Sequence, residues 1–574
     1  MFKEQQGILR EELRLGVVAS VSAQFVKVNL AQAGNVSGTY ICGNRYGLGE
    51  VGEFVIIEAQ RTINLGRITE VKLPERDRTE VTQDYDGKGG LDAIGFVQLL
   101  GSVDLNNLKV QAGVVSYPRL GDRVYAAPSI LLALIPSLLN SGVEDCGDDP
   151  DSALLIELGE VTGELGCKIR VSPEKLFGRH CAILGSTGGG KSWTTAKIIE
   201  ECAKFKNAKI IVIDATGEYR GLDEGYTGHY HLCSPLSVHP SSVPILIPPT
   251  NFVESDFVAL FEPSSKVQAP KFKEAIKSLR LVELVPSLAN NKGYLSKINL
   301  PKKPYNDALK KDGNYKRVDN PGLSFNVDLL PLQIKEECCR NDSSEGWGKL
   351  DDFNFSACLT LLTRIYYVIN APSFKAVFNK EEKLDDFDTV FNSFFEGNKK
   401  IFRLCLSDVS YEFNAREIIS NVIGRKLLEL AREGKFKERP LVVFVDEAHN
   451  FLGKKIGLEE HAAKLDAFEL IAKEGRKYGL NICLTTQRPR DITEGVLSQM
   501  GTLIVHRLTN DKDREVVERA CGELDRTATA FLPNLKQGEV ALVGVDFPIP
   551  MSVQVDKPNA RPKSDGADFQ KNWN

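Results

Sequence analysis

The sequence predicts an α/β fold of three parts: a small β-barrel, an open α/β core, and a helical subdomain inserted into that core. Three observations predict it. Short alternating segments fill residues 1–165, apolar strands alternate with amphipathic helices in the second half, and long helical patterns interrupt that alternation. The predicted divisions are the barrel at 1–165, the core at 166–250 and 396–556, the insert at 251–395 and a flexible tail at 557–574.

Composition places the chain among ordinary globular proteins. It has 574 residues, of which 42% are hydrophobic and 26% are charged, and this length suits two or more domains. No apolar run reaches the roughly 18 residues of a membrane span, and the first residues lack the apolar centre of a signal peptide. We therefore expect a cytoplasmic protein with no membrane segment. The 12 cysteines form no C-x-x-C pair, which argues against a zinc site.

The net charge of −5 bears on possible partners. It argues against a surface that is coated with nucleic acid as a whole. A local basic channel remains compatible with it, because the field that a ligand meets is set by nearby charges.

The pattern of the first 165 residues predicts a β-barrel. Alternating segments recur at residues 16–21, 25–30, 54–58, 93–100 and 123–126, with Gly, Asn and Pro between them. Many short strands at this spacing are typical of a small β-barrel. No catalytic set occurs in this region, so we expect it to serve assembly and packing.

A complete phosphate-loop motif follows the barrel. The apolar strand 181–184 leads into the pattern G-x-x-x-x-G-K-[ST], and an amphipathic helix comes next. Successive backbone N–H groups in such a loop wrap phosphates at a helix N-terminus. We expect Lys191 to reach the β- and γ-phosphates of ATP, and the Ser192 hydroxyl to bind Mg²⁺. The predicted nucleotide-binding residues are Gly185, Ser186, Thr187, Gly188, Gly189, Gly190, Lys191, Ser192 and Trp193.

Acidic residues end two further apolar strands of the core. Asp214 ends the strand 208–214 and Glu218 follows it. These residues either position water or metal, or couple the nucleotide to a moving loop, or act as an N-cap and a surface carboxylate. Asp446 and Glu447 end the strand 441–449. Asp446 is predicted to hold Mg²⁺ and Glu447 to polarise the attacking water. His449 either links the nucleotide to DNA contacts or forms a local hydrogen bond.

Two more predictions come from the rest of the core. Gln487 stands at the end of the strand 479–486, beside the Asp-Glu strand, where it is suited to sense the γ-phosphate. Residues 464–478 are predicted to be helical, and residues 538–544 and 551–555 to form a closing hairpin. In the insert, the segment 302–317 mixes six basic residues with two tyrosines, and is either a contact for a phosphate backbone or a solvated loop.

Together these motifs resemble the HerA family of hexameric DNA translocases, within the HerA/FtsK group of P-loop ATPases. The resemblance rests on RH before GSTGGGKS, on DATGEY, FVDEAHNFL, EGRKYGLNICLTTQRP and QGEVALVG, and it is weakest in the insert. It implies a RecA-like P-loop core behind a HAS-barrel. It also implies a homo-hexameric ring with ATP between neighbouring subunits and double-stranded DNA in the central channel.

The resemblance assigns two catalytic arginines and a partner. Arg476 matches a family arginine that acts in trans, and Arg179 matches the arginine before the first core strand. A cation is needed where phosphoryl charge develops, although Arg476 in a surface ion pair is the plainer alternative. Relatives of this kind work with a separate effector, a nuclease or a sirtuin-like NADase, in anti-phage defence or DNA end processing. The barrel is the expected docking face.

Two alternatives to a DNA translocase remain open. One is a scaffold ring that assembles an effector and uses ATP as a conformational signal. The other is a protein-remodelling or conjugative coupling ATPase. The intact Lys191, Asp446, Glu447 and Gln487 disfavour a scaffold without activity, and the absence of a membrane segment disfavours a membrane-anchored coupling protein.

Overall fold

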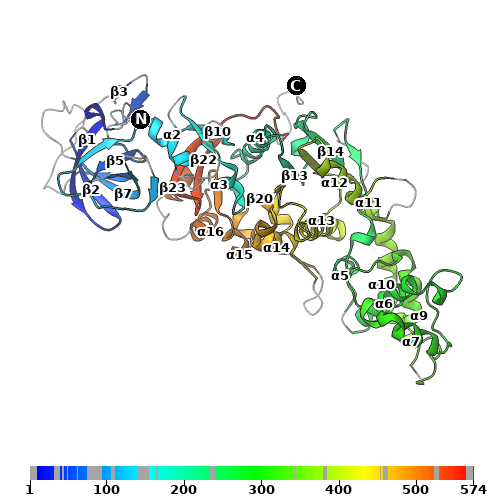
Figure 1. Cartoon of the computed structure of the whole chain (residues 1–574). Helices are drawn as coiled ribbons and strands as arrows, with labels where there is room; N and C mark the ends of the chain where they lie inside the picture. The colour runs from blue at the N-terminus through cyan, green and yellow to red at the C-terminus, as the bar shows by residue number, and fades with distance from the viewer. Residues whose placement is uncertain are drawn as a thin grey trace. The chain divides into compact units, whose positions relative to one another are not determined.

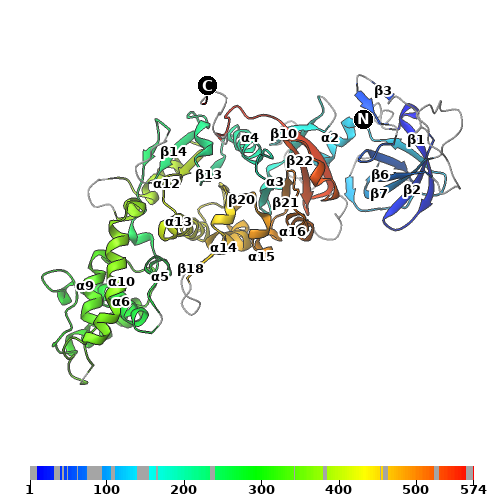
Figure 2. The same ribbon diagram turned by 180° about the vertical axis from the view of Figure 1, so that it is seen from behind.

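The chain folds into two compact units. One comprises Met1–Lys206 with Asn481–Pro562, and the other Asn207–Leu480 with Lys563–Asn574. Figures 1 and 2 show their elements from two sides. The computed structural model describes residues 9–31, 39–41, 44–47, 49–60, 62–73, 93–104, 110–138, 154–162, 166–232, 239–264, 266–341, 343–378, 384–452, 454–456, 463–521, 529–563 and 573. Most of the tail predicted at 557–574 lies outside these residues.

The first unit begins with a closed barrel of six antiparallel strands. Its strands are β1 (Arg14–Val21), β2 (Phe25–Leu30), β5 (Phe54–Glu58), β6 (Thr62–Lys72), β7 (Ala93–Asp104) and β9 (Arg123–Ala126). Closure arises because β2 pairs with both β1 and β7. Inward-facing residues such as Val26, Ile56 and Val97 are fully buried. The predicted barrel is confirmed, and Figure 1 shows it in blue.

Short elements complete the barrel region. Strand β8 (Val110–Ala112) extends the sheet beside β7, β3 (Thr39–Ile41) pairs with β4 (Asn44–Tyr46), and helix α2 (Ser129–Leu138) follows the barrel.

The same unit contains the strand that carries the phosphate loop. The strand order is β11 (Lys168–Val171), β10 (Ile156–Val161), β23 (Phe547–Val555), β22 (Glu539–Gly544), β21 (Thr502–Val505), β12 (Cys181–Leu184) and β20 (Leu480–Thr486). Strand β12 runs parallel to both β20 and β21, and all four of its residues are fully buried. Burial on both faces explains its continuous apolar sequence. Strands β22 and β23 form the predicted closing hairpin.

Helices of the first unit pack around these strands. They are α3 (Pro173–Phe177), α4 (Lys191–Ala203), α15 (Glu494–Leu497) and α16 (Asp511–Cys521). Helix α4 is amphipathic, and its buried face includes Ala196, Ile198 and Ile199. This face therefore anchors the helix that follows the phosphate loop.

The second unit holds the strands that end in acidic residues. Five parallel strands lie in the order β17 (Leu441–Val445), β13 (Lys209–Asp214), β16 (Ile401–Cys405), β14 (Thr227–His231) and β15 (Val243–Pro244). The long helix α13 (Ala415–Arg432) follows β16, and α14 (Ala467–Glu474) precedes β20. Phenylalanines of α12 (Phe387–Glu396) pack against Phe402 of β16, which forms an aromatic core beside the sheet.

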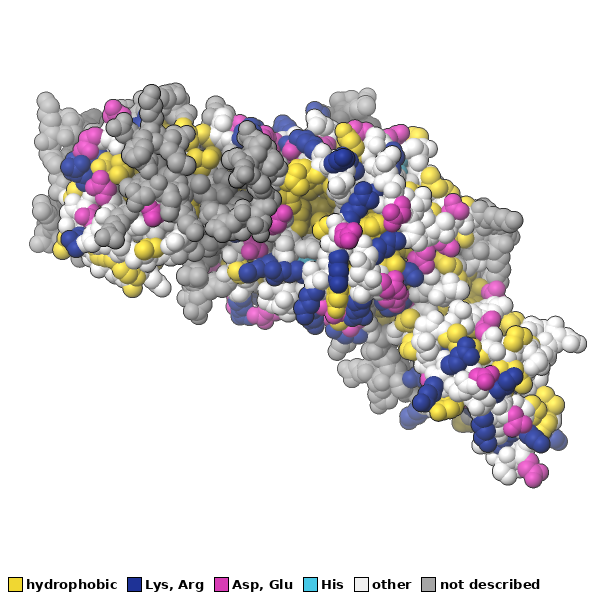
Figure 3. All heavy atoms as spheres, viewed as in Figure 1, with side chains coloured by type: hydrophobic (Ala, Val, Ile, Leu, Met, Phe, Trp, Pro, Cys, Tyr) yellow, Lys and Arg dark blue, Asp and Glu magenta, His cyan; other side chains and the backbone are white. Residues whose placement is uncertain are grey.

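Helices form the insert between β15 and β16, as predicted. Besides α12, they are α5 (Glu254–Phe261), α6 (Gln268–Leu284), α7 (Lys303–Lys310), α8 (Asn314–Arg317), α9 (Leu330–Glu337), α10 (Asp352–Asn370) and α11 (Lys375–Phe378). The ion pair between Lys297 and Glu337 is buried within it. Figure 3 shows acidic and basic side chains mixed on the visible face of the insert, without a patch of one sign. Among the described residues, no helix has the length and apolar character that crossing a membrane requires.

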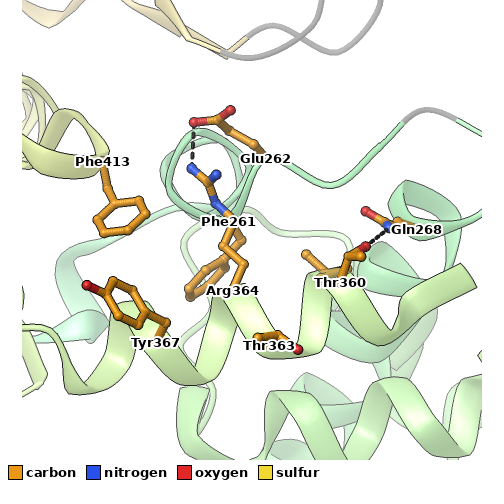
Figure 4. A pocket seen from close by; sticks show the side chains of 9 residues that line it. Phe261, Glu262, Gln268, Thr360, Thr363, Arg364, Tyr367 and Phe413 are labelled. Atoms are coloured by element: carbon orange, nitrogen blue, oxygen red, sulfur yellow. Dashed lines mark hydrogen bonds and ion pairs between the residues drawn. The ribbon is translucent and has the colours of Figure 1, made fainter. Parts of the chain in front are cut away.

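A groove of about 550 Å³ opens on the insert. Figure 4 shows the rings of Tyr367 and Phe413 side by side in it, and Arg364 paired with Glu262 at 2.6 Å. Phe413 adopts a left-handed backbone with φ of 55°, which is unusual for a bulky side chain. The groove contains none of the predicted site residues.

The structure differs from the sequence-based prediction at three places. The segment 302–317 forms α7, a short 3₁₀ turn and α8, so it is not a loop. The predicted helix 464–478 is shorter, because residues 463–465 form β19, which pairs with β18 (Lys454–Ile456), and residues 475–478 form a 3₁₀ turn. The strand predicted at 441–449 ends at Val445, since Glu447 turns into the left-handed region.

Candidate active site

The phosphate loop has the strand–loop–helix form that the motif predicts. Strand β12 ends at Leu184, and α4 begins at Lys191, with Ser192 and Trp193 in its first turn. Gly188 and Gly190 have φ of 76° and 105°, in the left-handed region where a side chain would be strained. The glycines are therefore needed for the course of the loop.

One face of the loop packs against His506, which directly follows β21. A Cβ added to Gly185 would lie 2.5 Å from the Cβ of His506, and one on Gly190 would lie 3.4 Å from the imidazole. His506 is fully buried, and among the described residues neither ring nitrogen makes a hydrogen bond of ordinary geometry. Burial, followed by the charge of Lys191, lowers the pKa of His506 to about 3. The imidazole is therefore neutral, and the Cβ of His506 leaves no room for a side chain at Gly185.

The loop also satisfies its own polar groups. The Ser186 carbonyl accepts hydrogen bonds from the Lys191 ammonium at 3.1 Å and from the Gly189 N–H at 3.2 Å. Lys191 is 8% exposed. A phosphate that enters the loop would compete with the Ser186 carbonyl for this ammonium.

Gln487 reaches the loop from the end of β20. The Thr187 hydroxyl donates a hydrogen bond to Gln487 Oε1 at 2.5 Å. Because β20 runs parallel to β12, both strands deliver their following residues to the same edge of the sheet. The structure thus brings the predicted glutamine to the predicted phosphate loop.

In the second unit, Asp446 lies buried after β17. Its carboxylate accepts hydrogen bonds from the Thr216 hydroxyl at 3.3 Å and the Tyr219 hydroxyl at 3.4 Å. Burial, and then the carboxylates of Asp214, Glu218 and Glu447, raise the pKa of Asp446 well above its usual value. A divalent cation beside Asp446 would stabilise its ionised form. Among the described residues, no three His, Cys, Asp or Glu side chains are placed to hold such an ion without further ligands.

Asp214 has a structural role in this cluster. Its carboxylate accepts hydrogen bonds from the backbone N–H groups of Gly217, Glu218 and Tyr219, at 2.8–3.1 Å. The Arg403 guanidinium donates to it at 2.7 Å, and both side chains are buried. Of the alternatives for Asp214, the capping role is the one that the structure favours.

Glu218 differs from Asp214. Its Oε2 is buried and has no hydrogen-bond partner among the described residues. The carboxyl also contributes to the raised pKa of Asp446. Glu218 is therefore not a simple surface carboxylate.

Glu447 is held in a strained conformation next to Asp446. Its φ is 46°, in the left-handed region, and its Oε2 lies 3.2 Å from Nδ1 of His449. Strained backbone of this kind is typical of functional sites. The local contact to Glu447 is the role of His449 that the structure supports.

The two predicted arginines lie at the other ends of their strands. Arg179 precedes β12, so that strand separates it from its own phosphate loop, and it pairs with Asp546 at 3.7 Å. Arg476 lies in a 3₁₀ turn (Gly475–Tyr478) before β20 and is exposed. No ion pair involves Arg476 in the part of the chain that the structure describes. The surface ion pair considered for it is therefore not seen.

Fold and site together define a P-loop ATPase. Two family models match the chain: the HerA helicase central domain over residues 156–320 and the HerA-like helicase C-terminal domain over residues 424–534. These matches support a P-loop ATPase of the HerA family.

Individual relatives have low sequence identity to this chain, but the matches extend over most of both chains. The probable DNA double-strand break repair helicase HerA of Methanocaldococcus jannaschii is 25% identical, over 74% of this chain and 81% of the relative. The DNA double-strand break repair helicase HerA of Pyrococcus furiosus is 24% identical, over 81% of this chain and 77% of the relative. Among solved structures, the plasmid coupling protein TrwB with a non-hydrolysable ATP analogue is 15% identical, over 71% of this chain and 91% of that chain, with a TM-score of 0.41.

The contact between the loop and His506 predicts the effect of a single methyl group. Gly185→Ala should lower the free energy of unfolding by about 1–3 kcal/mol, because the new Cβ overlaps His506. It should also weaken binding of a fluorescent ADP. The control is Gly495→Ala, where a Cβ meets nothing within 4 Å and should have little effect. Equal denaturation midpoints and equal ADP affinities for the two variants would show that the close approach is wrong.

The buried pair of Asp214 and Arg403 predicts a stability effect. Asp214→Asn leaves the guanidinium without its counter-charge and should lower the free energy of unfolding by about 3–5 kcal/mol. Denaturant unfolding measures it, with the exposed Asp223→Asn as control. An unchanged midpoint combined with loss of Mg²⁺-dependent nucleotide binding would instead make Asp214 a metal ligand.

Proposed function

We propose that this protein is the ATP-driven motor of a hexameric ring that translocates double-stranded DNA. In this proposal the motor works with a separate effector, a nuclease or a sirtuin-like NADase, in anti-phage defence or DNA end processing. The observation that carries it is the complete phosphate loop, with Gln487 against it, in a chain of the HerA family. Relatives named as DNA double-strand break repair helicases support DNA as the substrate.

The roles of the loop residues follow from their chemistry. Lys191 would leave the Ser186 carbonyl and neutralise the β- and γ-phosphates. Ser192 and Asp446 would hold Mg²⁺, which supplies positive charge to the phosphates when it is bound. The neighbouring carboxylates that raise the pKa of Asp446 support this assignment, because they favour a cation there.

The hydrolytic step would use Glu447 and Gln487. Glu447 orients and polarises the attacking water, and Gln487 exchanges its hydrogen bond with Thr187 for one with the γ-phosphate. Arg476, with Arg179 as the second candidate, would supply the cation that stabilises the transferred phosphoryl group of a neighbouring subunit. Arg476 is exposed and has no ion pair within the described part of the chain, which supports a partner outside its own chain.

Three further points belong to the proposal. The barrel, which contains no catalytic set, is the proposed docking face of the effector. The division of the chain at residues 165, 250, 395 and 556 is the proposed domain organisation. The cytoplasm is the proposed compartment.

The deciding experiment measures ATP hydrolysis and movement together. Purified protein of known native mass is assayed for ATPase activity with and without double-stranded DNA, and for displacement of a third strand from a DNA triplex. We expect DNA to stimulate hydrolysis and the triplex strand to be displaced. A ring that hydrolyses ATP, ignores DNA and still activates an effector would be a scaffold.

The division of roles between Lys191 and Glu447 gives one prediction. Lys191→Ala should lose most ATP binding, whereas Glu447→Gln should bind ATP normally and hydrolyse it at least about 100-fold more slowly. Equilibrium binding and steady-state ATPase assays measure the two effects. The exposed Glu438→Gln, in the same unit, is the control and should match the wild type. Normal turnover by Glu447→Gln would refute its role as the base.

The exposed Arg476 gives a prediction about the ring. Pure rings of Arg476→Ala or of Lys191→Ala should be inactive, because an arginine finger contributes about 10³–10⁵ to the rate. Mixed rings should regain ATPase activity, since an intact phosphate loop can then face an intact arginine. The neighbouring Lys477→Ala serves as control and should leave activity close to the wild type.

Two results would count against this arrangement. Rings shown by native mass to be mixed, yet without recovered activity, would argue against action in trans. Full activity of pure Arg476→Ala rings would leave Arg179 as the catalytic arginine.

A further inference from the structure

Two segments of the first unit meet the phosphate loop on the flank away from Gln487. After β21, the Arg507 carbonyl accepts hydrogen bonds from the Ser186 N–H at 3.1 Å and from the Ser186 hydroxyl at 3.0 Å. Before β22, the Gly538 N–H donates to the Gly189 carbonyl at 3.3 Å. Strand β21 lies on one side of β12 and β20 on the other. The loop is therefore bounded on both flanks.

The contact on this flank is fixed by packing. His506, one residue before Arg507, fills the space against Gly185 and Gly190. Its backbone N–H also donates to the Leu184 carbonyl at 2.7 Å. The backbone of Arg507 consequently has a set position beside the loop.

Each of these two segments carries a cation: Arg507 itself, and Lys536 two residues before Gly538. The side chains of Arg507 and Lys536 are exposed, and neither makes an ion pair or side-chain hydrogen bond among the described residues. Two other cations of this unit, near the ends of β12, already have partners. Lys191 donates to the Ser186 carbonyl, and Arg179 pairs with Asp546 at the opposite end of β12.

We propose that Arg507 and Lys536 bind the α- and β-phosphates of the nucleotide, the part that leaves as ADP. The inference rests on the proposed function, which gives the γ-phosphate to the flank of Gln487. The opposite flank is then left for the diphosphate, and its two free cations suit that charge. ATP and ADP would both make these contacts, so the contacts set the affinity for the nucleotide and not the rate of hydrolysis.

Calorimetric titration of the full-length protein with ADP tests the proposal without turnover. Arg507→Gln and Lys536→Gln should each raise the Kd for ADP by about ten- to a hundredfold, the range for hydrogen bonds to charged groups. Arg507→Lys should recover part of the affinity. At saturating ATP, kcat should stay within about twofold of the wild type, because the lost contact is a ground-state contact. The control is Arg519→Gln on α16, an exposed arginine of the same unit.

Inorganic pyrophosphate, measured in competition with ADP, identifies the group that is contacted. Its affinity should fall with that of ADP. Weakened ADP but unchanged pyrophosphate binding would place Arg507 at the nucleoside and overturn the proposal.

Two other results would also overturn it. An unchanged Kd for ADP in both variants would remove the two cations from the nucleotide. A lower kcat at unchanged ADP affinity would put them at the transferred phosphate. A wild type that binds ADP but is not stimulated by DNA would refute the proposed function alone.

Discussion

The close approach between the phosphate loop and His506 is the contact on which the rest of the site depends. A Cβ at Gly185 would overlap the side chain of His506, so the loop can lie this close to His506 only with glycine at that position. Parallel strands β20 and β21, on either side of β12, then deliver Gln487 and Arg507 to opposite flanks of the same loop. The register of the parallel strands thus determines which residues lie beside the loop.

Buried carboxylates of the second unit lie at the ends of two of its strands. Asp214 and Arg403 neutralise each other, and three backbone N–H groups complete the shell of the carboxylate. Asp446 pairs with no cation among the described residues, and burial, followed by the neighbouring acidic groups, raises its pKa. The carboxylates at the ends of two adjacent strands thus have different surroundings, because among the described residues only Asp214 pairs with an arginine. A cation beside Asp446 would favour its ionised form.

The sequence predicts what is local and misses what depends on distant partners. Strand β12, the phosphate loop and helix α4 were predictable, since the motif and the apolar pattern lie within a short stretch. The role of Asp214 was not, because Arg403 lies far along the chain and meets it only through the pairing of β13 with β16. Arg507 carries no motif, and its place beside Ser186 follows from the register of β21 against β12. Residues 464 and 465 were assigned to a helix, because the pairing of β19 with β18 has no local signal.

Strand direction also constrains the two arginines. In a parallel sheet, residues before a strand and residues after it lie at opposite edges. Arg179 and the phosphate loop are separated by the four residues of β12, a length of about 13 Å. Arg476 and Gln487 are separated by the seven residues of β20, about 23 Å. These spans are longer than an arginine side chain. Along its own strand, neither arginine side chain therefore reaches the edge of the sheet to which that strand runs.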